Sequence, residues 1–291
     1  MAATICPPTA LPDWSNTQYH ADISRVSKSG LDKIAKSPAH YFHAYLSPDR
    51  PTREETPAMR LGSAIHCAIL EPAAFPDRYG YLDDALIVAE IGGGNPRATA
   101  KYKSWKAAVE MENVDKVVLT NAEYQTCVKM RAAVWAHPTA AKLLTAPGRV
   151  EQTFLFTEPA SGAACKVRPD KVAEMDGDVL IVDLKSTEDA SASEFGRSAV
   201  NFGYDKQAAF YSDGFQHATG ITPAAVVFIA VEKSAPYNVA VYFADEEVMQ
   251  LGREKYLANC KTYAECVKSG VWPGYGNEVN NLKLPAYAFT K

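Results

Sequence analysis

Two aspartates, Asp170 and Asp183, stand in segments that have the residue types of neighbouring β-strands. The dipeptide Asp176-Gly177 lies between the segments 164–174 and 178–186 and strongly favours a two-residue hairpin turn. With these two residues in the turn, the hairpin register places the two carboxylates directly opposite each other, with Cβ atoms about 5 Å apart. The pattern therefore predicts a pair of facing carboxylates on one side of a hairpin.

Facing carboxylates repel each other, by about 3 kcal/mol at an effective dielectric constant of about 20. A shared proton or the ammonium group of Lys185 can offset part of this repulsion, whereas a divalent cation offsets it best. Mg²⁺ prefers carboxylate oxygens and keeps coordination positions for water and phosphate. The same register places Arg168 opposite Lys185 on this face, where Lys185 can orient or deprotonate a metal-bound water or stabilise a transition state.

The alternative is a hairpin whose charged residues simply face water. Pro169 argues against it, since proline removes a donor from the hydrogen-bond ladder of a strand. The apolar run 179–182 is typical of a central, buried strand. Asp183 directly follows that run, and we expect it at the end of the strand, where active-site residues collect.

The sequence Pro169-Asp170, followed by Asp183-x-Lys185 on the next predicted strand, resembles the motif of the PD-(D/E)xK nucleases. Three further segments resemble parts of the RecB and RecE branch of that superfamily, in the same chain order: 29–38, 61–66 (Leu-Gly-Ser-Ala-Ile-His) and 207–211 (Gln-Ala-Ala-Phe-Tyr). The resemblance is closest to the RecE-like exonucleases of phages and prophages, with the lambda exonuclease as a more distant relative. Many relatives have Glu where this chain has Asp183, whose side chain is shorter.

The resemblance implies a role for each matched residue. The implied metal ligands are His66, Asp170, Asp183 and the Leu184 carbonyl. Lys185 would be the catalytic lysine. The implied cofactor is Mg²⁺, with Mn²⁺ as a substitute.

Three other residues have less specific signals. Glu151, on the predicted strand 150–157, resembles an additional acidic residue that contacts a second metal or a water. Gln207 and Tyr211 would hold a DNA phosphate or buttress the site. Each signal also has a plain structural explanation. Glu151 is typical of a solvent-facing strand residue, and His66 is typical of a core histidine. The spacing of Gln207 and Tyr211 is typical of a partly buried helix.

Candidate DNA contacts are cationic residues, because contacts to the phosphate backbone need no sequence-specific groups. We single out Arg168 near the motif and three cations on predicted helices: Lys33, Arg60 and Lys103. Lys103 belongs to a basic cluster over 97–106 that also contains Tyr102 and Trp105. A solvated helix face is the alternative for these lysines.

The remaining pattern predicts the elements that must position these groups. Helices are expected near 27–37, 40–46, 58–70, 99–112, 120–145 with a break at 137–138, 190–200, 203–218 and 245–268, with further strands at 224–232 and 237–244. Residues 73–100 are expected to form an exposed loop. We predict an α/β protein of the PD-(D/E)xK nuclease-like fold, with a central mixed β-sheet flanked by helices and a helical N-terminal part. Its predicted divisions are a lead-in over 1–24 and a single nuclease domain over 25–291, helical over 25–149 and carrying the catalytic sheet and C-terminal helices over 150–291.

Composition limits the class of protein. With 291 residues, 47% hydrophobic and 22% charged, the chain is a folded globular protein rather than a disordered one. No apolar run is long enough to span a membrane, and the N-terminus lacks the pattern of a secretory signal. The six cysteines form no CxxC pair, which argues against a zinc ribbon or an iron–sulfur cluster and favours free thiols in a reducing cytoplasm. The resemblance implies in addition that the protein is bacterial or phage-encoded.

The function implied by the resemblance is Mg²⁺-dependent hydrolysis of DNA phosphodiester bonds. In detail it implies processive 5′-to-3′ digestion from double-stranded DNA ends by a homo-oligomeric ring, in homologous recombination with a single-strand annealing protein. Three alternatives stay open: a related nuclease that acts on single strands, a catalytically silent DNA-binding or assembly module of the same fold, and a metal-dependent hydrolase of small phosphoesters.

Overall fold

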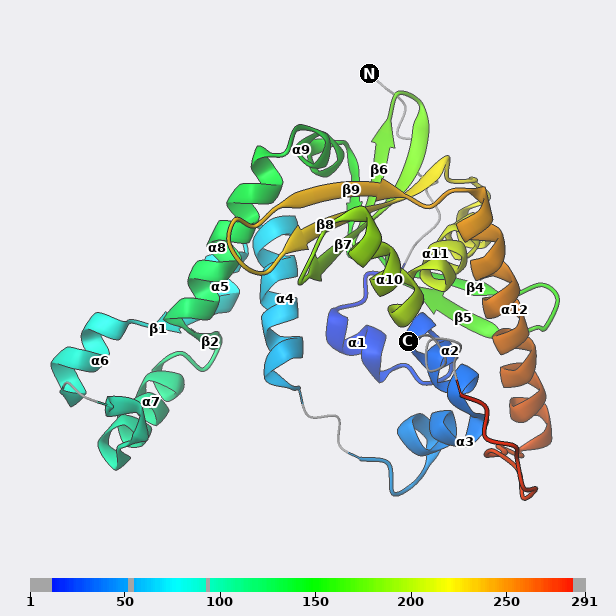
Figure 1. Cartoon of the computed structure of the whole chain (residues 1–291), viewed down its shortest axis with the longest axis horizontal. Helices are drawn as coiled ribbons and strands as arrows, with labels where there is room; N and C mark the ends of the chain where they lie inside the picture. Colours follow the sequence, from blue (N-terminus) through cyan, green and yellow to red (C-terminus); the bar gives the residue numbers. More distant parts are fainter. Residues whose placement is uncertain (1–11, 52–54, 93–94, 285–291) are drawn as a thin grey trace.

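Helices cover both faces of a five-stranded mixed sheet (Figure 1). The computed structural model describes residues 12–51, 55–92 and 95–284. In spatial order the strands are β3 (Gly148–Val150), β6 (Lys171–Met175), β7 (Asp178–Thr187), β8 (Ala225–Glu232) and β9 (Val239–Phe243). Only β7 and β8 run parallel among these neighbours. The predicted fold class, α/β with a central mixed sheet flanked by helices and a helical N-terminal part, is confirmed.

The hairpin of β6 and β7 forms at the predicted turn. Asp176 and Gly177 have φ values of 54° and 94°, the positive values that this two-residue turn requires. Met175 pairs with Asp178 and Lys171 with Val182, so the predicted register is confirmed as far as the ladder extends. The apolar run makes β7 the middle strand of the sheet, as predicted.

The predicted strands 164–174 and 150–157 are each interrupted. β5 (Ala164–Val167) pairs with β4 (Phe154–Thr157) in a separate two-stranded sheet, and the chain enters the main sheet again only at the start of β6. The break falls at Pro169, which has no N–H to donate to a ladder. The prediction that Arg168 lies opposite Lys185 is therefore wrong.

Successive residues of β7 face different helical layers. Ile181 lies in the core that includes α2 (Lys28–Lys36), α10 (Ala192–Phe202), α11 (Tyr204–Thr219) and α12 (Glu246–Ser269). Val182 and Leu184 lie in the core that includes α4 (Pro57–Leu70), α8 (Asn121–Ala136) and α9 (Pro138–Thr145). By this alternation, Asp183 and Lys185 face the α11 layer, while α4 covers the opposite face.

The helices expected outside the loop region and the predicted strands 224–232 and 237–244 lie close to their predicted ranges. The predicted helix 40–46 is a short α3 (Pro38–Tyr41) followed by a π-helical turn, Phe42–Leu46. Two other short elements are α5 (Phe75–Arg78) and a 3₁₀ turn, Pro96–Ala98. Within the described ranges, no helix combines the length and apolar character needed to cross a bilayer.

Residues 79–120 form an arm that projects from the body beside α8 (Figure 1). It consists of the parallel strands β1 (Tyr79–Leu82) and β2 (Val117–Thr120) and the helices α6 (Asp84–Ile91) and α7 (Ala100–Glu112). The prediction of a loop over 73–100 is therefore wrong.

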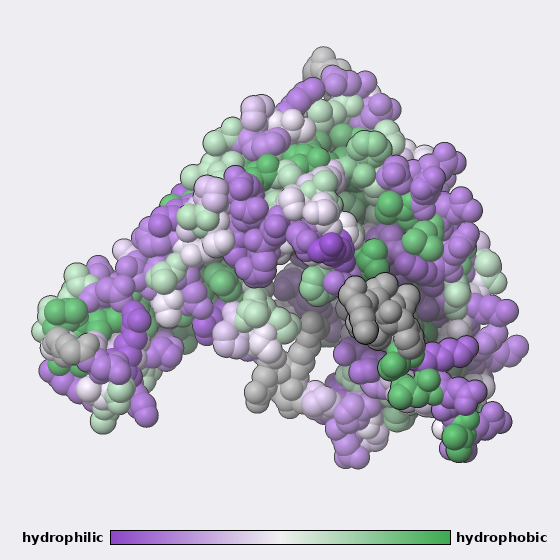
Figure 2. Space-filling view, in the orientation of Figure 1, coloured by the Kyte–Doolittle hydropathy of each residue, from purple (hydrophilic) through white to green (hydrophobic). Residues whose placement is uncertain are grey.

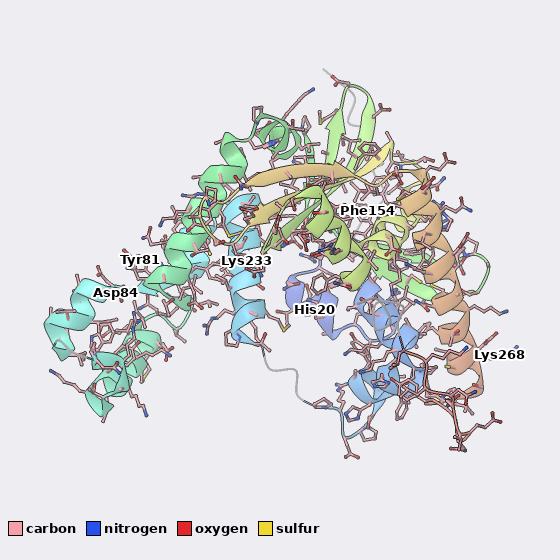
Figure 3. All side chains as sticks on the ribbon, in the orientation of Figure 1. His20, Tyr81, Asp84, Phe154, Lys233 and Lys268 are labelled. Atoms are coloured by element: carbon pink, nitrogen blue, oxygen red, sulfur yellow. The ribbon has the colours of Figure 1, made fainter. Side chains whose placement is uncertain are left out.

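The arm has a small core of its own, in which Leu82, Ile87 and Tyr102 are buried. Where the arm joins the body, the ring of Tyr81, labelled in Figure 3, lies 4.6 Å from that of Tyr124 on α8. Figure 2 shows hydrophobic residues gathered at the outer end of the arm, over α6. The loop prediction missed α6 because its apolar residues show little helical periodicity, and its buried Ile87 packs in the small core of the arm.

The lead-in is also more ordered than predicted. Residues 1–11 lie outside the described part of the chain, but α1 (Asn16–Ala21) is a short helix with a capping box between Ser15 and Gln18. Tyr19 on this helix is buried against the body. The division into a lead-in over 1–24 and a domain over 25–291 stays a prediction.

Candidate active site

The break before β6 creates a gap beside the middle of β7. Continuing the hairpin register would place Leu184 opposite Pro169, which cannot donate a hydrogen bond. The N–H of Leu184 instead donates to Oδ2 of Asp170 at 2.6 Å. Because the N–H and C=O of one strand residue point to the same side, the Leu184 carbonyl also faces this gap. The proline of the motif thus interrupts the hydrogen-bond ladder, and the carboxylate of the aspartate accepts the hydrogen bond in place of the missing strand.

Two further ligand-type side chains reach the same gap. His66 comes from α4, and its Nδ1 lies 3.5 Å from Oδ2 of Asp170. Glu151 lies in the bend between β3 and β4, where a φ of 50° turns the chain and its N–H donates to the Asp170 carbonyl at 3.0 Å. Within the described residues, ligand atoms of His66, Glu151 and Asp170 all lie within 4.8 Å of one another, an arrangement that could hold a metal ion.

Asp183 and Lys185 lie next to this group, on the α11 side of β7. Oδ2 of Asp183 accepts a hydrogen bond from Nε2 of Gln207 at 2.6 Å, and its Oδ1 forms an ion pair with Nζ of Lys185. Lys185 also donates to Oε1 of Gln207 at 2.9 Å, with its Nζ 4.7 Å from the centre of the Tyr204 ring. Asp183 is 2% exposed and β7 continues to Thr187, so the expectation of a strand-end position is wrong.

The charges of the site shift its pKa values in opposite directions. Burial and the nearby Asp170 raise the pKa of Glu151 to about 7 and that of Asp183 to about 6, against the opposing effects of Arg168 and Lys185. Burial also disfavours ionised Asp170, but His66, Lys185 and the Leu184 N–H outweigh it and hold the pKa of Asp170 below its ordinary value.

The pKa values of the two cationic groups, His66 and Lys185, are both raised. Burial opposes protonation of His66, but Asp170 and the other carboxylates hold its pKa above the ordinary value. The pKa of Lys185 is likewise raised, because Asp183 and Asp170 outweigh its burial. Lys185 is therefore a protonated ammonium at neutral pH.

The donor set suits a divalent metal. One imidazole nitrogen, carboxylate oxygens and a backbone carbonyl face the gap, where burial and the nearby Asp170 raise the pKa of Glu151. Oxygen donors are typical of Mg²⁺ and Mn²⁺ sites, and an imidazole is compatible with a transition metal. The predicted ligands His66, Asp170 and the Leu184 carbonyl thus meet at one place. Asp183 adjoins them, but its oxygens are taken up by Lys185 and Gln207.

Of the predicted DNA-contacting residues near the motif, Gln207 and Arg168 have internal partners. Gln207 holds both Asp183 and Lys185, which is the buttressing role that the resemblance left open. Tyr211 is half-buried one turn further along α11, and burial raises its pKa well above the ordinary value. Arg168 donates through Nε to Glu151 at 2.9 Å and through Nη1 to the Trp14 carbonyl at 2.7 Å.

The other three predicted DNA contacts lie outside the cluster. Lys33 is exposed on α2 and Lys103 is exposed on α7, in the projecting arm (Figure 1). Arg60 on α4 lies 3.5 Å from Glu123. The structure does not bring these cations together with the motif residues, and their contact with DNA stays a prediction.

Sequence reasoning missed two residues beside the site. The ring of Tyr204 lies under Lys185. Tyr204 stands just before the Gln-x-x-x-Tyr segment, and no sequence pattern marks it as part of the site. Trp14 lies in the supposed lead-in, and only its large aromatic side chain set it apart. It lines a cavity of about 940 Å³ that extends from His66 and Glu151.

Metal-free stability should depend on Glu151 in a defined pH range. The folded-state pKa of about 7 lies above the ordinary value of 4.5, so the folded protein holds a proton that the unfolded chain releases between these values. Stability without metal should therefore fall as the pH rises from about 4.5 to 7. We expect Glu151→Gln to raise the Tm in EDTA at pH 8 and to have a smaller effect at pH 5, as measured by calorimetry.

The matched control is Glu265→Gln, at an exposed position on α12, which should leave the Tm unchanged at both pH values. Added Mg²⁺ should raise the Tm of the unsubstituted protein at pH 8 more than that of Glu151→Gln, because a cation relieves the same repulsion. A Tm of Glu151→Gln below that of the unsubstituted protein at pH 8 would contradict the charge balance described above.

Comparisons with known proteins identify the family and the fold. Residues 27–285 match the model of a family described as "PDDEXK-like domain of unknown function (DUF3799)", and the chain belongs to that family. A solved putative exonuclease from Eubacterium rectale is 17% identical, covers 96% of this chain and 98% of its own, and superposes with a TM-score of 0.60. This likeness shows a shared fold.

Two other solved structures are more remote. A phage-related exonuclease from Haemophilus somnus 129PT is 15% identical over 63% of this chain and 94% of its own, with a TM-score of 0.30. An alkaline exonuclease from Laribacter hongkongensis is 13% identical over 65% and 97%, with a TM-score of 0.26. No curated protein matches the sequence. Family membership and fold confirm the predicted resemblance to the PD-(D/E)xK nucleases and indicate a nuclease.

Proposed function

We propose that the protein is a divalent-metal-dependent deoxyribonuclease that hydrolyses phosphodiester bonds, with Mg²⁺ as the natural cation and Mn²⁺ as a substitute. The observation that carries this proposal is the convergence of His66, Glu151 and Asp170 in the gap beside β7, next to the half-buried Lys185, which pairs with Asp183 and whose pKa Asp183 and Asp170 raise. A metal site formed mainly by oxygen ligands, next to a fixed positive charge, suits the transfer of a phosphoryl group to water.

The residues divide the work as follows. When bound, a divalent cation would supply the charge that polarises the phosphate and lowers the pKa of the attacking water. His66, Asp170 and the Leu184 carbonyl would hold it. The water oxygen forms a bond to phosphorus and its proton passes to a site carboxylate or to solvent. The bond to the leaving oxygen breaks, and this oxygen takes up a proton from solvent.

Lys185 would stabilise the developing negative charge rather than accept a proton. Its pKa is raised, so its ammonium can donate hydrogen bonds to a phosphate but cannot serve as a base at neutral pH. Asp183 and Gln207 fix its position from two sides. Asp183 would thus act on the reaction through Lys185, and also as a ligand if the cation draws it from the lysine.

We further propose that the substrate is a double-stranded DNA end, digested processively from 5′ to 3′ by a homo-oligomeric ring, in recombination with a single-strand annealing protein. Its support is the resemblance of the motif residues to the RecE-like exonucleases and the fold shared with the putative exonuclease from E. rectale. The proposal applies to the whole chain, because the two chains cover each other almost completely.

Digestion of a duplex labelled at either end tests both levels of the proposal. With Mg²⁺ or Mn²⁺, the 5′ label should be released first as mononucleotide, and EDTA should stop the reaction. First release of the 3′ label would reject the proposed 5′-to-3′ polarity. Faster digestion of a single strand would reject the duplex substrate and favour the single-strand alternative. Intact DNA under all metal conditions would favour the silent binding module or the small-phosphoester hydrolase. An assay with a small phosphodiester analogue then separates these two alternatives, because only the hydrolase cleaves the analogue.

A further inference from the structure

A cavity among the described residues opens directly from the candidate metal ligands. It has a volume of about 940 Å³, within the range of ligand-binding pockets, and its inner end is formed by His66 and Glu151. Its lining includes Met59 and Ser63 from α4 and, from the segment that leads into α1, Trp14. A substrate group held at the metal ligands would therefore extend into this cavity.

The wall that contains Trp14 is fixed to the site by side chains of the sheet region. Nη1 of Arg168 donates to the Trp14 carbonyl at 2.7 Å, while Nε of the same guanidinium donates to Glu151 at 2.9 Å. Nε2 of Gln152 donates to the Pro12 carbonyl at 2.9 Å. One arginine thus ties the Trp14 segment to a candidate metal ligand, so the wall and the metal group are positioned together.

The lining is unsuited to a second phosphate. Its two arginines are both paired within the described structure, Arg78 with Glu71 through two hydrogen bonds of 2.7 and 2.8 Å and Arg168 with Glu151. Asp13 adds a negative charge at the cavity. Phosphate binding needs accessible cations or N–H donors, and negative charge disfavours it.

The rest of the lining suits an uncharged, partly aromatic group. Trp14 is half-buried and offers an indole, and Asn16, Thr17 and Ser63 supply neutral hydrogen-bonding groups. A nucleobase binds by stacking on an aromatic ring and by hydrogen bonds to neutral polar groups. A deoxynucleoside combines such a base with a sugar whose oxygen atoms also accept hydrogen bonds.

We propose that this cavity is a nucleoside subsite, which receives the base and sugar of the terminal nucleotide while its phosphate lies at the His66–Glu151–Asp170 group. The base stacks on Trp14, and Arg168 is a positioning residue that holds the stacking wall in register with Glu151. This inference rests on the proposed nuclease function and adds the part of the substrate that the cavity binds.

Titration with a mononucleotide tests the subsite without any turnover. In Mg²⁺, dTMP should quench tryptophan emission of the unsubstituted protein and of Trp105→Phe, a matched control in which a tryptophan is removed from the arm. The quenching should disappear in Trp14→Phe, and inorganic phosphate alone should produce none. Equal quenching in Trp14→Phe, or equal quenching by phosphate, would overturn the proposal.

Kinetics on end-labelled duplex provide the second measurement. Trp14→Ala should raise KM by roughly 5- to 150-fold, the range expected for losing one base–aromatic stack, and leave kcat much less affected. Trp14→Phe should restore most of the KM and keeps the test available if the alanine variant fails to fold. An unchanged KM in a folded Trp14→Ala variant would reject the subsite. Failure of the unsubstituted protein to digest DNA would instead reject the proposed function, whereas the dTMP titration judges the cavity separately.

Discussion

Asp183→Asn is expected to lower the rate of DNA digestion by about 10³-fold or more without unfolding the protein. The carboxylate of Asp183 holds the Lys185 ammonium and adjoins the candidate metal ligands, so the neutral amide removes a charge that both need. Asparagine has nearly the same volume and keeps an oxygen that can accept the hydrogen bond from Gln207. Initial rates on labelled duplex at saturating Mg²⁺, together with circular dichroism and Tm, measure the two effects separately.

Asp213→Asn is the matched control for this substitution. Asp213 is also a buried aspartate, but its oxygens bind Arg253 and Tyr256 on α12. We expect this variant to lose thermal stability and to keep its specific activity at a temperature well below its Tm, because the pair joins two helices outside the site. If Asp183→Asn digests DNA within twofold of the unsubstituted protein, the assignment of the active site is wrong.

The second large effect is expected for Lys185→Met, with kcat reduced roughly 10²- to 10³-fold. The ammonium lies between Asp183 and Gln207, where it can donate hydrogen bonds to a phosphate oxygen, and methionine preserves the bulk of the side chain without the charge. The substitution removes no metal-ligating atom. Affinity for Mn²⁺, measured by calorimetric titration of the protein without DNA, should therefore change far less than kcat.

Lys206→Met provides a control for this substitution. Lys206 directly precedes Gln207 on α11. Lys206 is buried, and its ammonium lies against Asp32 on α2 instead of the candidate site. Its specific activity should stay near that of the unsubstituted protein even if the Tm falls. A Lys185→Met variant that loses Mn²⁺ binding while its kcat at saturating metal is unchanged would refute the role in charge stabilisation.

Several features of the site were predictable from local sequence. The Asp176-Gly177 turn and the apolar run after it determine the β6–β7 hairpin and its register, because the turn requires positive φ values at both residues and the two strands are adjacent in the chain. The motif residues and the helix of His66 could be named through their resemblance to a nuclease family. These signals depend on neighbouring residues, or on a pattern that can be compared directly.

Which partners Asp170 and Asp183 contact depends on where the β6–β7 hydrogen-bond ladder ends. The register continued past Lys171 would place the side chains of Asp170 and Asp183 across from each other. In the structure the ladder stops before Pro169, and Asp170 turns to the Leu184 N–H and His66. Asp183 is left to Lys185 and Gln207, and only the packing of α11 against this face of β7 brings Gln207 there.

The sequence alone thus determined the hairpin, the order of most helices and strands, and the identity of the motif residues. The tertiary structure alone decided that Glu151 joins His66 and Asp170, that Trp14 forms a wall of the same cavity, and that residues 79–120 form an arm. The physical reason is the range of the interactions. Turn conformation and strand alternation act between near neighbours in the chain, whereas the Arg168 contacts with Trp14 and Glu151 join segments whose separation no local pattern encodes.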